Sequence, residues 1–546
     1  MPPMELGSLV AGTIDDTLRV SLPLFRTELA LAVTVVLVLL CRMLPVLRWL
    51  DSGLVALGGI AFAFWYAWCD TTGLPLSGWP AADAVPGHQE LFGGLLVFDA
   101  LTATIRLLLV GFLLLYIPFT KVSGIPDRED GADFYTLVLG AALGMCLMAS
   151  ANHLLMVFMA VEMASVPSYA LAGMLKGRKA SSEAALKYAV YGAGAAGVML
   201  YGISLLAGTL GTCHLPSMAA ELSRVVGADS GTTMVLVLGG LMVAVGLAFK
   251  LSAVPFHFWC PDVFEGAAAE VGAFLSVASK AAAVALVVRL TFGLGTLAAG
   301  PGGEGLADVR FFMLVVVAVM AAATCTLGNL AAYGQTNMKR MLAYSTIAHA
   351  GYLMMGVAAA VATMGVAPGQ ARDAVSALAF YLGTYLFMNL AAFAIVAVLR
   401  NRLRSEEISA YAGLVRSNPG MVVATAVVLV SLIGLPPLAG FVGKFLVFSS
   451  LAQAISSGVT SPAVRSLLLA LLVVGGVNTV ISLFYYLRVL KVMTFDPPST
   501  DRFVDANAPV WLPSGLVTAL ALPIVVLGMF WSGLYAFAQL AGRFAS

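Results

Sequence analysis

The stretch GLAFKLSAVPFHFWCPDVFEGA, residues 246–267, places a lysine and a proline inside an apolar segment that is otherwise suited to cross a membrane. A second stretch, SLIGLPPLAGFVGKFLVF at 431–448, combines two prolines with another lysine. Pro255, Pro436 and Pro437 each remove a backbone donor, and such breaks persist in a membrane only where protein or water meets the freed carbonyls. A simple kink is one interpretation of a single break. Two breaks, each within seven residues of a lysine, favour discontinuous helices with a function.

The composition places these stretches in a membrane protein. Hydrophobic residues make up 60% of the 546 residues and charged residues only 10%, against about 25% charged residues in soluble domains. No soluble core could bury that much apolar surface, so we predict an all-α polytopic membrane protein. About 14 transmembrane helices are expected, because 14 apolar segments approach the roughly 20 residues that a bilayer demands. They lie near 28–47, 53–70, 97–118, 133–149, 152–173, 183–208, 232–254, 266–293, 311–331, 341–363, 373–399, 418–452, 466–492 and 511–540.

The two breaks also predict the internal organisation, because they fall in spans 7 and 12. An odd separation of five spans makes the two broken helices run in opposite directions. This arrangement is typical of inverted-topology repeats, in which discontinuous helices meet ion sites near the midplane. We predict N-terminal spans 1–3 at 1–130, a first five-helix repeat (spans 4–8) at 131–293, an inverted second repeat (spans 9–13) at 294–493, and a C-terminal loop and span 14 at 494–546.

The distribution of Lys and Arg predicts the orientation of the chain. If the N-terminus is outside, 16 cationic residues fall in cytoplasmic loops and seven on the outer side, with the remaining six inside spans. Cytoplasmic loops normally carry this excess. Both termini are therefore predicted on the outer, periplasmic side.

Five ionisable side chains fall inside the predicted spans: Glu162, Lys187, Lys250, Lys280 and Lys444. Each charge there costs roughly 3 kcal/mol on insertion scales. A chain with five of them on five spans is predicted to use them, and ionisable groups spread across a bilayer are what a proton needs to cross it. The six cysteines show no C-x-x-C spacing, and no phosphate-binding loop or G-x-G-x-x-G with an acidic ribose anchor is present. Metal, iron–sulfur and nucleotide binding are therefore not expected on this chain.

Five runs, in order, make the chain similar to a known superfamily. They are ALKYAVYGAGAAGVMLYG (185–202), FKLSAVPFHFWCPDVFEGA (249–267), FLSVASKAA (274–282), NMKRMLAYSTIAHAGYLMMG (337–356) and GLPPLAGFVGKF (434–445). They resemble the antiporter-like subunits of respiratory complex I. Within that superfamily the chain looks most like the subunit N family of bacterial NADH–quinone oxidoreductases, the counterpart of mitochondrial NADH dehydrogenase subunit 2. The similarity extends from about residue 90 to residue 495.

The resemblance implies a membrane-arm subunit that moves protons while other subunits oxidise NADH and reduce quinone. NADH, FMN, iron–sulfur clusters and quinone are then expected in partner subunits, and no cofactor on this chain. The expected partners are other membrane-arm subunits, including the neighbouring antiporter-like subunit and small membrane subunits, within the bacterial inner (plasma) membrane. Nucleic acid is not expected. Carried over residue by residue, the family's fifth-span glutamate is Glu162, and its lysines of the sixth, broken seventh, eighth and broken twelfth spans are Lys187, Lys250, Lys280 and Lys444.

Lys250 is expected to be the central proton carrier, because Pro255 and the following FHFW place it inside the break. Burial alone is enough to let a lysine exchange its proton near neutral pH. The alternative is a lysine that snorkels to the surface. Glu162 is expected to pair with Lys187 on the next helix, and separation of this pair would then drive the proton from Lys250 onward. Glu183, four residues before Lys187, offers a competing pair along the same helix.

The remaining candidates extend the path. Lys280 is expected to relay the proton beyond Lys250, and Lys444 to carry it on the exit side. His349 suits a hop between the two halves because an unperturbed histidine titrates near neutral pH; the alternative is a histidine used for packing. His257, beside the first break, is interpreted either as a relay or as a cap. Asp262 and Glu265 are expected in the cytoplasmic loop as caps of the eighth span.

Two other classes of protein remain open at this point. A subunit of a multisubunit cation/proton antiporter shares the implied fold, although a sodium path would favour more carboxylates than lysines in the spans. A structural, non-pumping membrane subunit would use the same charges only to hold subunits together. Replacement of Lys250 by alanine separates transport from anchoring, since loss of transport with normal assembly supports the former.

Overall fold

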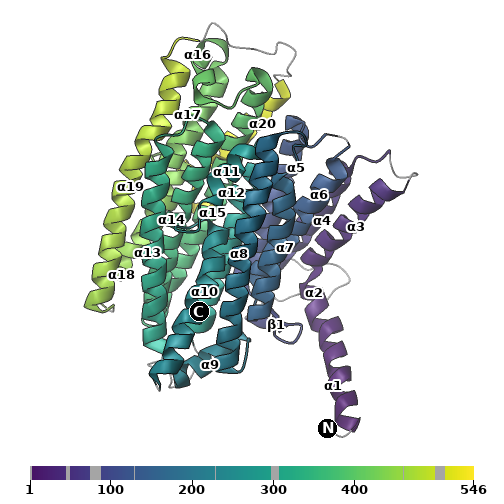
Figure 1. Cartoon of the computed structure of the whole chain (residues 1–546), viewed down its shortest axis with the longest axis vertical. Coiled ribbons are helices and arrows are strands. Elements are labelled where there is room, and N and C mark those ends of the chain that lie inside the picture. Colours follow the sequence, from purple (N-terminus) through teal and green to yellow (C-terminus); the bar gives the residue numbers. More distant parts are fainter. Residues whose placement is uncertain are drawn as a thin grey trace.

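Long helices running side by side form most of the molecule (Figure 1). The computed structural model describes residues 3–44, 49–73, 88–127, 129–227, 229–296, 306–458, 460–498 and 511–545. In these ranges, 13 helices are long and apolar enough to cross a membrane, or up to 14 if one bent pair counts as a span. The prediction of an all-α polytopic membrane protein is confirmed.

The N-terminal part contains one small hairpin among its helices, with β1 antiparallel to β2. Its elements are α1 (Pro3–Asp16), a π-helix (Thr17–Ser21), α2 (Leu22–Leu24), α3 (Arg26–Met43), α4 (Ser52–Thr72), β1 (Gln89–Leu91), β2 (Leu96–Phe98) and α5 (Ala100–Ser123).

The middle of the chain forms seven helices: α6 (Gly131–Ser150), α7 (Leu154–Ala172), α8 (Lys179–Leu210), α9 (Leu215–Val225), α10 (Ser230–Leu251), α11 (Trp259–Gly266) and α12 (Ala269–Gly295). The last part forms α13 (Ala307–Ala332), α14 (Met338–Thr363), α15 (Pro368–Leu403), α16 (Leu414–Ser417), α17 (Pro419–Ile433), α18 (Ala439–Ser456), α19 (Pro462–Thr494), α20 (Trp511–Met529) and α21 (Ser532–Gly542), with short 3₁₀ turns at Ile408–Tyr411 and Arg543–Ala545.

Side-chain caps set where several of these helices begin. The Asp51 carboxylate accepts from the amides of Gly53 and Leu54 at the start of α4. Asp99 does the same for α5, and Asn337 for α14. Such caps satisfy amide groups that have no partner within the helix. The starts of these helices are therefore determined by residues close by in the sequence.

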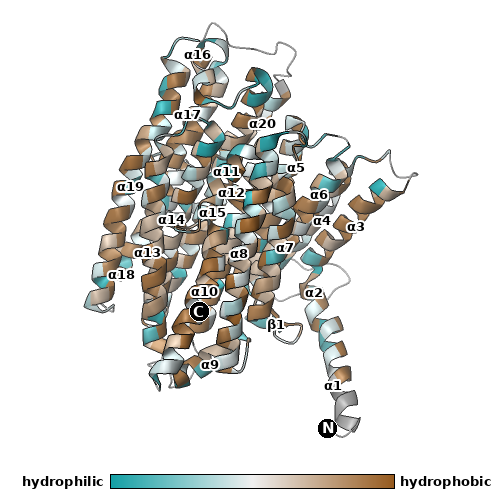
Figure 2. Cartoon of the chain, in the orientation of Figure 1, coloured by the Kyte–Doolittle hydropathy of each residue, from teal (hydrophilic) through white to brown (hydrophobic). Residues whose placement is uncertain are grey.

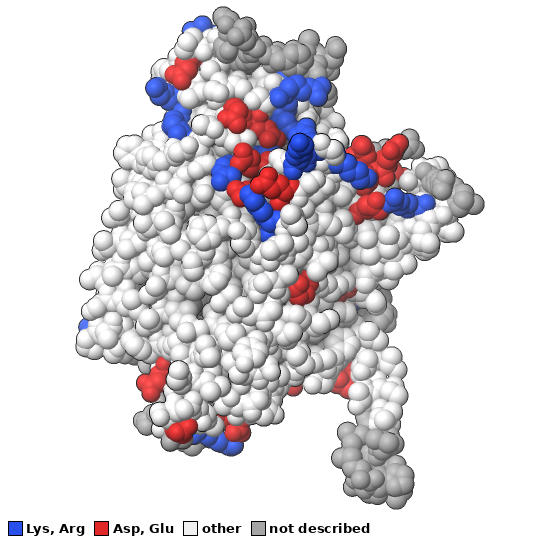
Figure 3. All heavy atoms as spheres, viewed as in Figure 1, with Lys and Arg blue, Asp and Glu red and all other residues white. Residues whose placement is uncertain are grey.

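Three helices, α12, α14 and α15, form the centre of the bundle. In the apolar 18-residue stretch of each of these helices, 100%, 94% and 89% of the residues are buried. The corresponding share is 28% in α19 and α20 at the periphery. Large side chains exposed on the outer helices are apolar, among them Leu238, Val319 and Val480. Figure 2 shows hydrophobic residues along the full height of the helices, and Figure 3 shows Lys, Arg, Asp and Glu gathered mainly at the two ends of the molecule. An apolar belt with charged ends is the surface that a bilayer demands.

Both predicted breaks are present. Helix α10 stops at Leu251, and the chain resumes as α11 at Trp259; α17 stops at Ile433, and α18 begins at Ala439. Pro255 lies in the first gap, and Pro436 and Pro437 lie in the second. The residue after each stop has a left-handed backbone, with φ 55° at Ser252 and 90° at Gly434. The breaks therefore leave helix-terminal carbonyls deep in the bundle.

The sequence analysis missed two features at the chain ends. Residues 3–24 are helical, and the helix from Val10 to Leu24 is bent by 81° from α3. The segment predicted as a single span at 511–540 is divided into α20 and α21. Helix α21 packs against α15 and α5 and buries Ala538, Ala541 and Gly542. A continuous apolar run does not report such a division, because both arms are equally apolar.

A glycine lets α20 approach the second break. A Cβ built on Gly528 would stand 2.1 Å from the carbonyl oxygen of Pro437, whereas one built on Gly515 of the same helix would meet nothing within 4 Å. Only a glycine fits at the first position without displacing the backbone opposite.

We expect Gly528→Val to destabilise the protein by about 1–3 kcal/mol, the usual cost of forcing extra methyl groups into a packed core. Gly515→Val is the control, because it adds the same side chain to the same helix in open space. Thermal unfolding of the two purified variants in detergent measures the difference. Equal melting temperatures would show that α20 does not hold the second break.

Candidate functional site

Lys250 lies in the last turn of α10, directly before the first break. Its side chain is buried, and its Nζ donates to the Ser165 hydroxyl of α7 at 3.0 Å. Two other charges, those of Glu162 and Lys280, act on it electrostatically. Lys250 is therefore held by a neutral hydroxyl and lies within electrostatic range of one acid and one further amine.

Lys280 closes the end of α10 from the neighbouring helix α12. Its buried Nζ donates to the carbonyl oxygen of Leu251 and, at 2.5 Å, to the Ser252 hydroxyl. The Trp259 ring lies beneath the ammonium group, 5.8 Å from Nζ to the ring centroid. A cation at a helix C-terminus is stabilised by the carbonyls that the helix leaves unpaired. Lys280 thus serves as the cap of the first break.

Lys444 closes the second break in the same way, although it comes from the helix that follows. Its buried Nζ donates to the carbonyl oxygens of Leu432 at 3.0 Å and Ile433 at 2.8 Å. The Tyr352 ring centroid lies 4.3 Å from the same nitrogen. Both broken helices therefore end on a buried lysine that rests over an aromatic ring.

His349 is enclosed by tyrosines of α14 and α15. Its Nδ1 lies 2.7 Å from the Tyr381 hydroxyl, and the tautomer decides which atom donates. The ring centroids of Tyr385 and Tyr352 lie 5.1 Å and 5.9 Å from that of His349. The charge of Lys444 also acts on His349. His349 is thus linked electrostatically to Lys444 at the second break. The tyrosines that surround it were not predicted from the sequence.

Lys187 is placed differently from the expectation. Its Nζ lies 2.7 Å from Glu183 and 2.7 Å from Asp262 of α11, and its side chain is 38% exposed. The expected ion pair with Glu162 is therefore wrong, and the competing pair with Glu183 is present. Glu183 on the same helix and Asp262 of α11 occupy the Lys187 ammonium group instead.

The same cluster extends to α14. Arg340 donates to Asp262 at 2.7 Å and to Glu265 at 2.6 Å, so neither acid serves as the expected cap of α12, whose N-cap residue is Ala268. Burial by itself raises the pKa of Asp262, but hydrogen bonds from Lys187 and Arg340 outweigh it and lower the pKa below its usual range. Asp262 is therefore ionised at neutral pH. Figure 3 shows acidic and basic groups mixed near one end of the molecule.

Glu162 and His257 complete the set of predicted residues. Glu162 is half-buried on α7, one turn before Ser165, and the charge that acts on it is that of Lys250. His257 is half-buried in the first gap, with its ring centroid 4.4 Å from that of Phe258. Within the described ranges, its Nδ1 is buried and has no hydrogen-bond partner. The structure thus brings Glu162, Lys250 and Lys280 together at the first break and His349 and Lys444 at the second.

Several buried ion pairs were not anticipated. Arg106, which the sequence analysis left without a role, donates to Glu28 at 2.5 Å, and beside this pair Arg26 meets Asp70. The other pairs are Arg289 with Asp99, Arg400 with Glu270, and Lys339 with Glu406. Their acids fall at the ends of spans or in loops, where a sequence pattern favours an exposed capping role. Their partners lie 44 to 190 residues away, so a local pattern cannot identify them.

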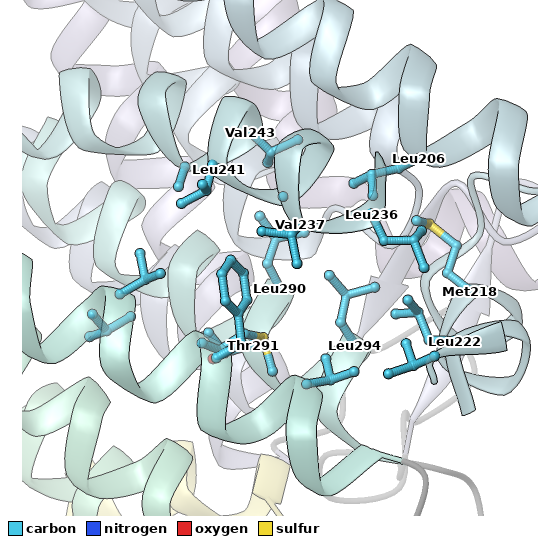
Figure 4. A pocket seen from close by; sticks show the side chains of 18 of the residues that line it. Leu206, Met218, Leu222, Leu236, Val237, Leu241, Val243, Leu290, Thr291 and Leu294 are labelled. Atoms are coloured by element: carbon cyan, nitrogen blue, oxygen red, sulfur yellow. The ribbon is translucent and has the colours of Figure 1, made fainter. Parts of the chain in front are cut away.

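An apolar cavity of about 240 Å³ lies apart from these charges. Figure 4 shows its walls, which come from α8, α9, α10, α12 and α13 and include Leu206, Met218, Leu236, Leu290 and Leu294. Ligand sites usually combine apolar walls with a few convergent polar groups. Here the lining is mostly aliphatic, and its polar members are Thr233, Thr291 and Asp308.

The sequence of the chain is similar to those of known membrane proteins. The family described as "NADH:quinone oxidoreductase/Mrp antiporter, TM" matches residues 151–469. NADH-quinone oxidoreductase subunit N 2 of Sorangium cellulosum is 40% identical over 96% of this chain and 97% of its own. Subunit N of Anaeromyxobacter sp. is 39% identical, over 82% of this chain and 84% of its own.

Solved structures share the fold. A chain of respiratory complex I from Thermus thermophilus is 32% identical, with a TM-score of 0.69 over 93% of this chain and 98% of its own. A chain of the Mrp complex from Dietzia sp. DQ12-45-1b has a TM-score of 0.71 over 97% of each chain at 19% identity. At that identity the likeness establishes the fold alone.

The buried pair of Arg289 and Asp99 gives a test of the packing around the site. We expect Asp99→Ala to cost about 3–5 kcal/mol, because it leaves a guanidinium buried without its carboxylate. Asp51→Ala is the matched control, since Asp51 also caps a helix and pairs with a cation, Lys121, but that pair is well exposed. Thermal unfolding in detergent compares them. Similar losses for both variants would contradict a structural role for the buried pair.

Proposed function

The chain belongs to the NADH:quinone oxidoreductase/Mrp antiporter family of membrane proteins, and on that premise we propose that it is subunit N of a bacterial complex I. In this role it moves protons across the membrane while partner subunits transfer electrons from NADH to quinone. The names of its relatives and the coverage of nearly the whole chain support this function.

The observation that carries the proposal is the way in which three buried lysines are held. Lys250, Lys280 and Lys444 donate to hydroxyl and carbonyl oxygens. The other buried cations in the described ranges, such as Arg289 and Lys339, pair with carboxylates. A lysine paired with a carboxylate stays charged, because its neutral form would leave an uncompensated buried anion. A lysine held by neutral oxygens can lose and regain its proton without that penalty.

We propose that protons pass from Glu162 to Lys250 and Lys280, then to His349 and Lys444. The electrostatic action of Glu162 and of Lys280 on Lys250 supports the first part, and that of Lys444 on His349 supports the last. The charge on each of these groups changes the free energy of protonating its neighbour along the path, so the proton moves in steps.

Lys187 and His257 belong to the cytoplasmic approach in this proposal. Lys187 anchors α8 to α11 through Asp262, and α11 directly follows the gap that contains His257. A shift of α11 would therefore change both the contacts of Lys187 and the surroundings of the first break.

We further propose that 131–293 and 294–493 are inverted repeats. A Cβ on Gly144 of α6 would press on the backbone nitrogen of Ala164 of α7 at 2.6 Å, and one on Gly328 of α13 on that of Ala348 of α14 at 2.7 Å. The two glycines are separated by the same number of residues as the two alanines. In this register Ser165, the partner of Lys250, corresponds to His349, which lies beside Lys444.

The proposal includes a topology and a set of partners. An excess of cationic loops at one end supports both termini on the outer side of the bacterial inner membrane. NADH, FMN, iron–sulfur clusters and quinone belong to partner subunits, and the neighbours are other membrane-arm subunits, including another antiporter-like chain. A cation/proton antiporter subunit is the alternative within the same family, but the relatives with high identity over most of the chain carry the complex I name.

In the assembled complex, we expect Lys250→Ala to reduce the number of protons pumped per NADH oxidised, because the proton path loses its central carrier. Assembly should be normal, since removal of Lys250 leaves only a serine hydroxyl without its donor. The measurement is proton uptake into proteoliposomes at a known rate of NADH oxidation.

Lys176→Ala is the control, because that lysine is 77% exposed and pairs with Asp130 at the surface. The proposal fails if the Lys250→Ala complex assembles and pumps like the control. Loss of assembly with unchanged stoichiometry in the residual complex would instead support a structural subunit.

A further inference from the structure

The proposed proton path lacks a link between Lys280 at the first break and His349 near the second. Lys280 lies on α12 and His349 on α14, and the hydrogen bonds of the described residues do not join them. Helix α15 packs against both α12 and α14. Helices α12 and α14 also contact each other directly, and a polar side chain on the face of α15 that meets both can link the two lysine sites.

Tyr385 of α15 is in that position. Its ring centroid lies 5.1 Å from that of His349, and its hydroxyl faces Thr346 of α14 and Asn389 of its own helix. It also lies within electrostatic range of Cys260, which is in range of Lys280 as well. Tyr385 thus adjoins the surroundings of both the first and the second break.

The hydroxyl of Tyr385 has no partner with hydrogen-bond geometry, although the residue is only 1% exposed. The Oδ1 atom of Asn389, one turn further along the same face, is also buried without a partner, and so is the hydroxyl of Ser279, next to Lys280. Leaving such a group unpaired costs about 1–3 kcal/mol. Buried polar atoms in proteins normally bond to protein or to ordered water. The three atoms lie on α12 and α15, which pack against each other, and bound water would supply the partners that they lack.

His349 leads onward from Tyr385 to the second break. Its Nδ1 is hydrogen-bonded to Tyr381, one turn before Tyr385. Tyr381 packs directly on α18, where a Cβ built on Gly443 would stand 2.7 Å from its ring. The next residue is Lys444. The polar groups of α15 therefore face the path from the Lys280 side to the Lys444 side.

We propose that Tyr385, with Asn389, carries protons between Lys280 and His349 through bound water, an inference that rests on the proposed function. The Lys280 ammonium group gives a proton to a bound water as that water passes one of its own protons to the phenol oxygen. The phenol proton leaves at the same time to the imidazole of His349, so Lys280 ends neutral and His349 ends protonated. The phenol is neutral before and after the step, so no charge is left on Tyr385. Reorientation of the hydroxyl restores the starting state.

The test uses Tyr385→Phe in the assembled complex, with protons pumped per NADH as the readout. The substitution keeps the ring that packs against His349 and removes only the hydroxyl. We expect normal assembly and a stoichiometry that falls to the level of the Lys250→Ala complex. Tyr411→Phe is the matched control, because the Tyr411 hydroxyl is likewise buried and unpartnered but lies in the 3₁₀ turn at Ile408–Tyr411. It should pump normally.

Asn389→Leu provides a second variant in case the first does not assemble, and it should lower the stoichiometry in the same way. Normal pumping by an assembled Tyr385→Phe or Asn389→Leu complex, beside a defective Lys250→Ala complex, would overturn this inference and leave the proposed function intact. Normal pumping by all three would overturn the proposed function itself. Restoration of pumping by Tyr385→His, which returns an exchangeable proton to the ring position, would exclude a purely structural effect of the hydroxyl.

Discussion

The structure depends on the contact between a lysine ammonium group and the open carbonyl end of a broken helix. A helix that stops inside a membrane leaves carbonyls without donors, and a buried ammonium group lacks acceptors. Either group alone would cost several kcal/mol. Lys280 at the end of α10 and Lys444 at the end of α17 offset both costs at once. The breaks and the capping lysines therefore require each other. At the second break the capping lysine, Lys444, lies in the same apolar stretch as the prolines, whereas at the first break it comes from α12.

This contact also separates two kinds of buried charge in the described ranges. Pairs such as Arg289 with Asp99 and Arg400 with Glu270 tie distant helices together with opposite charges, and they stay ionised. Lys250, Lys280 and Lys444 face neutral oxygens, and their charge is not fixed by a carboxylate. The first kind holds the bundle, whereas the second kind can alternate between charge states. A membrane protein that moves protons needs both kinds. The lysines change charge during transport, and the ion pairs must stay charged to keep the helices in place around them.

The sequence was sufficient for features that depend on local chemistry. Apolar length predicted the spans, and prolines in apolar surroundings predicted both breaks. Features that depend on distant partners were not predictable. One partner of Lys187 is Asp262, which is 75 residues away, and nothing near Glu162 or Lys187 indicates that α11 packs against α8. The tyrosines around His349 include Tyr381, 32 residues further on. Tyr381, Tyr385 and Asn389 recur at every fourth position, a weak signal that a polar face of α15 points inward.

The central claim is that lysines held by neutral oxygens change protonation during turnover. Infrared difference spectra of the assembled complex, recorded between the resting state and NADH-driven turnover with nitrogen-15-labelled lysine, report this most directly. The account predicts label-sensitive ammonium bands that lose intensity when Lys250 is replaced by methionine. Spectra in which those bands are absent, or are identical in the Lys250→Met complex, would contradict it.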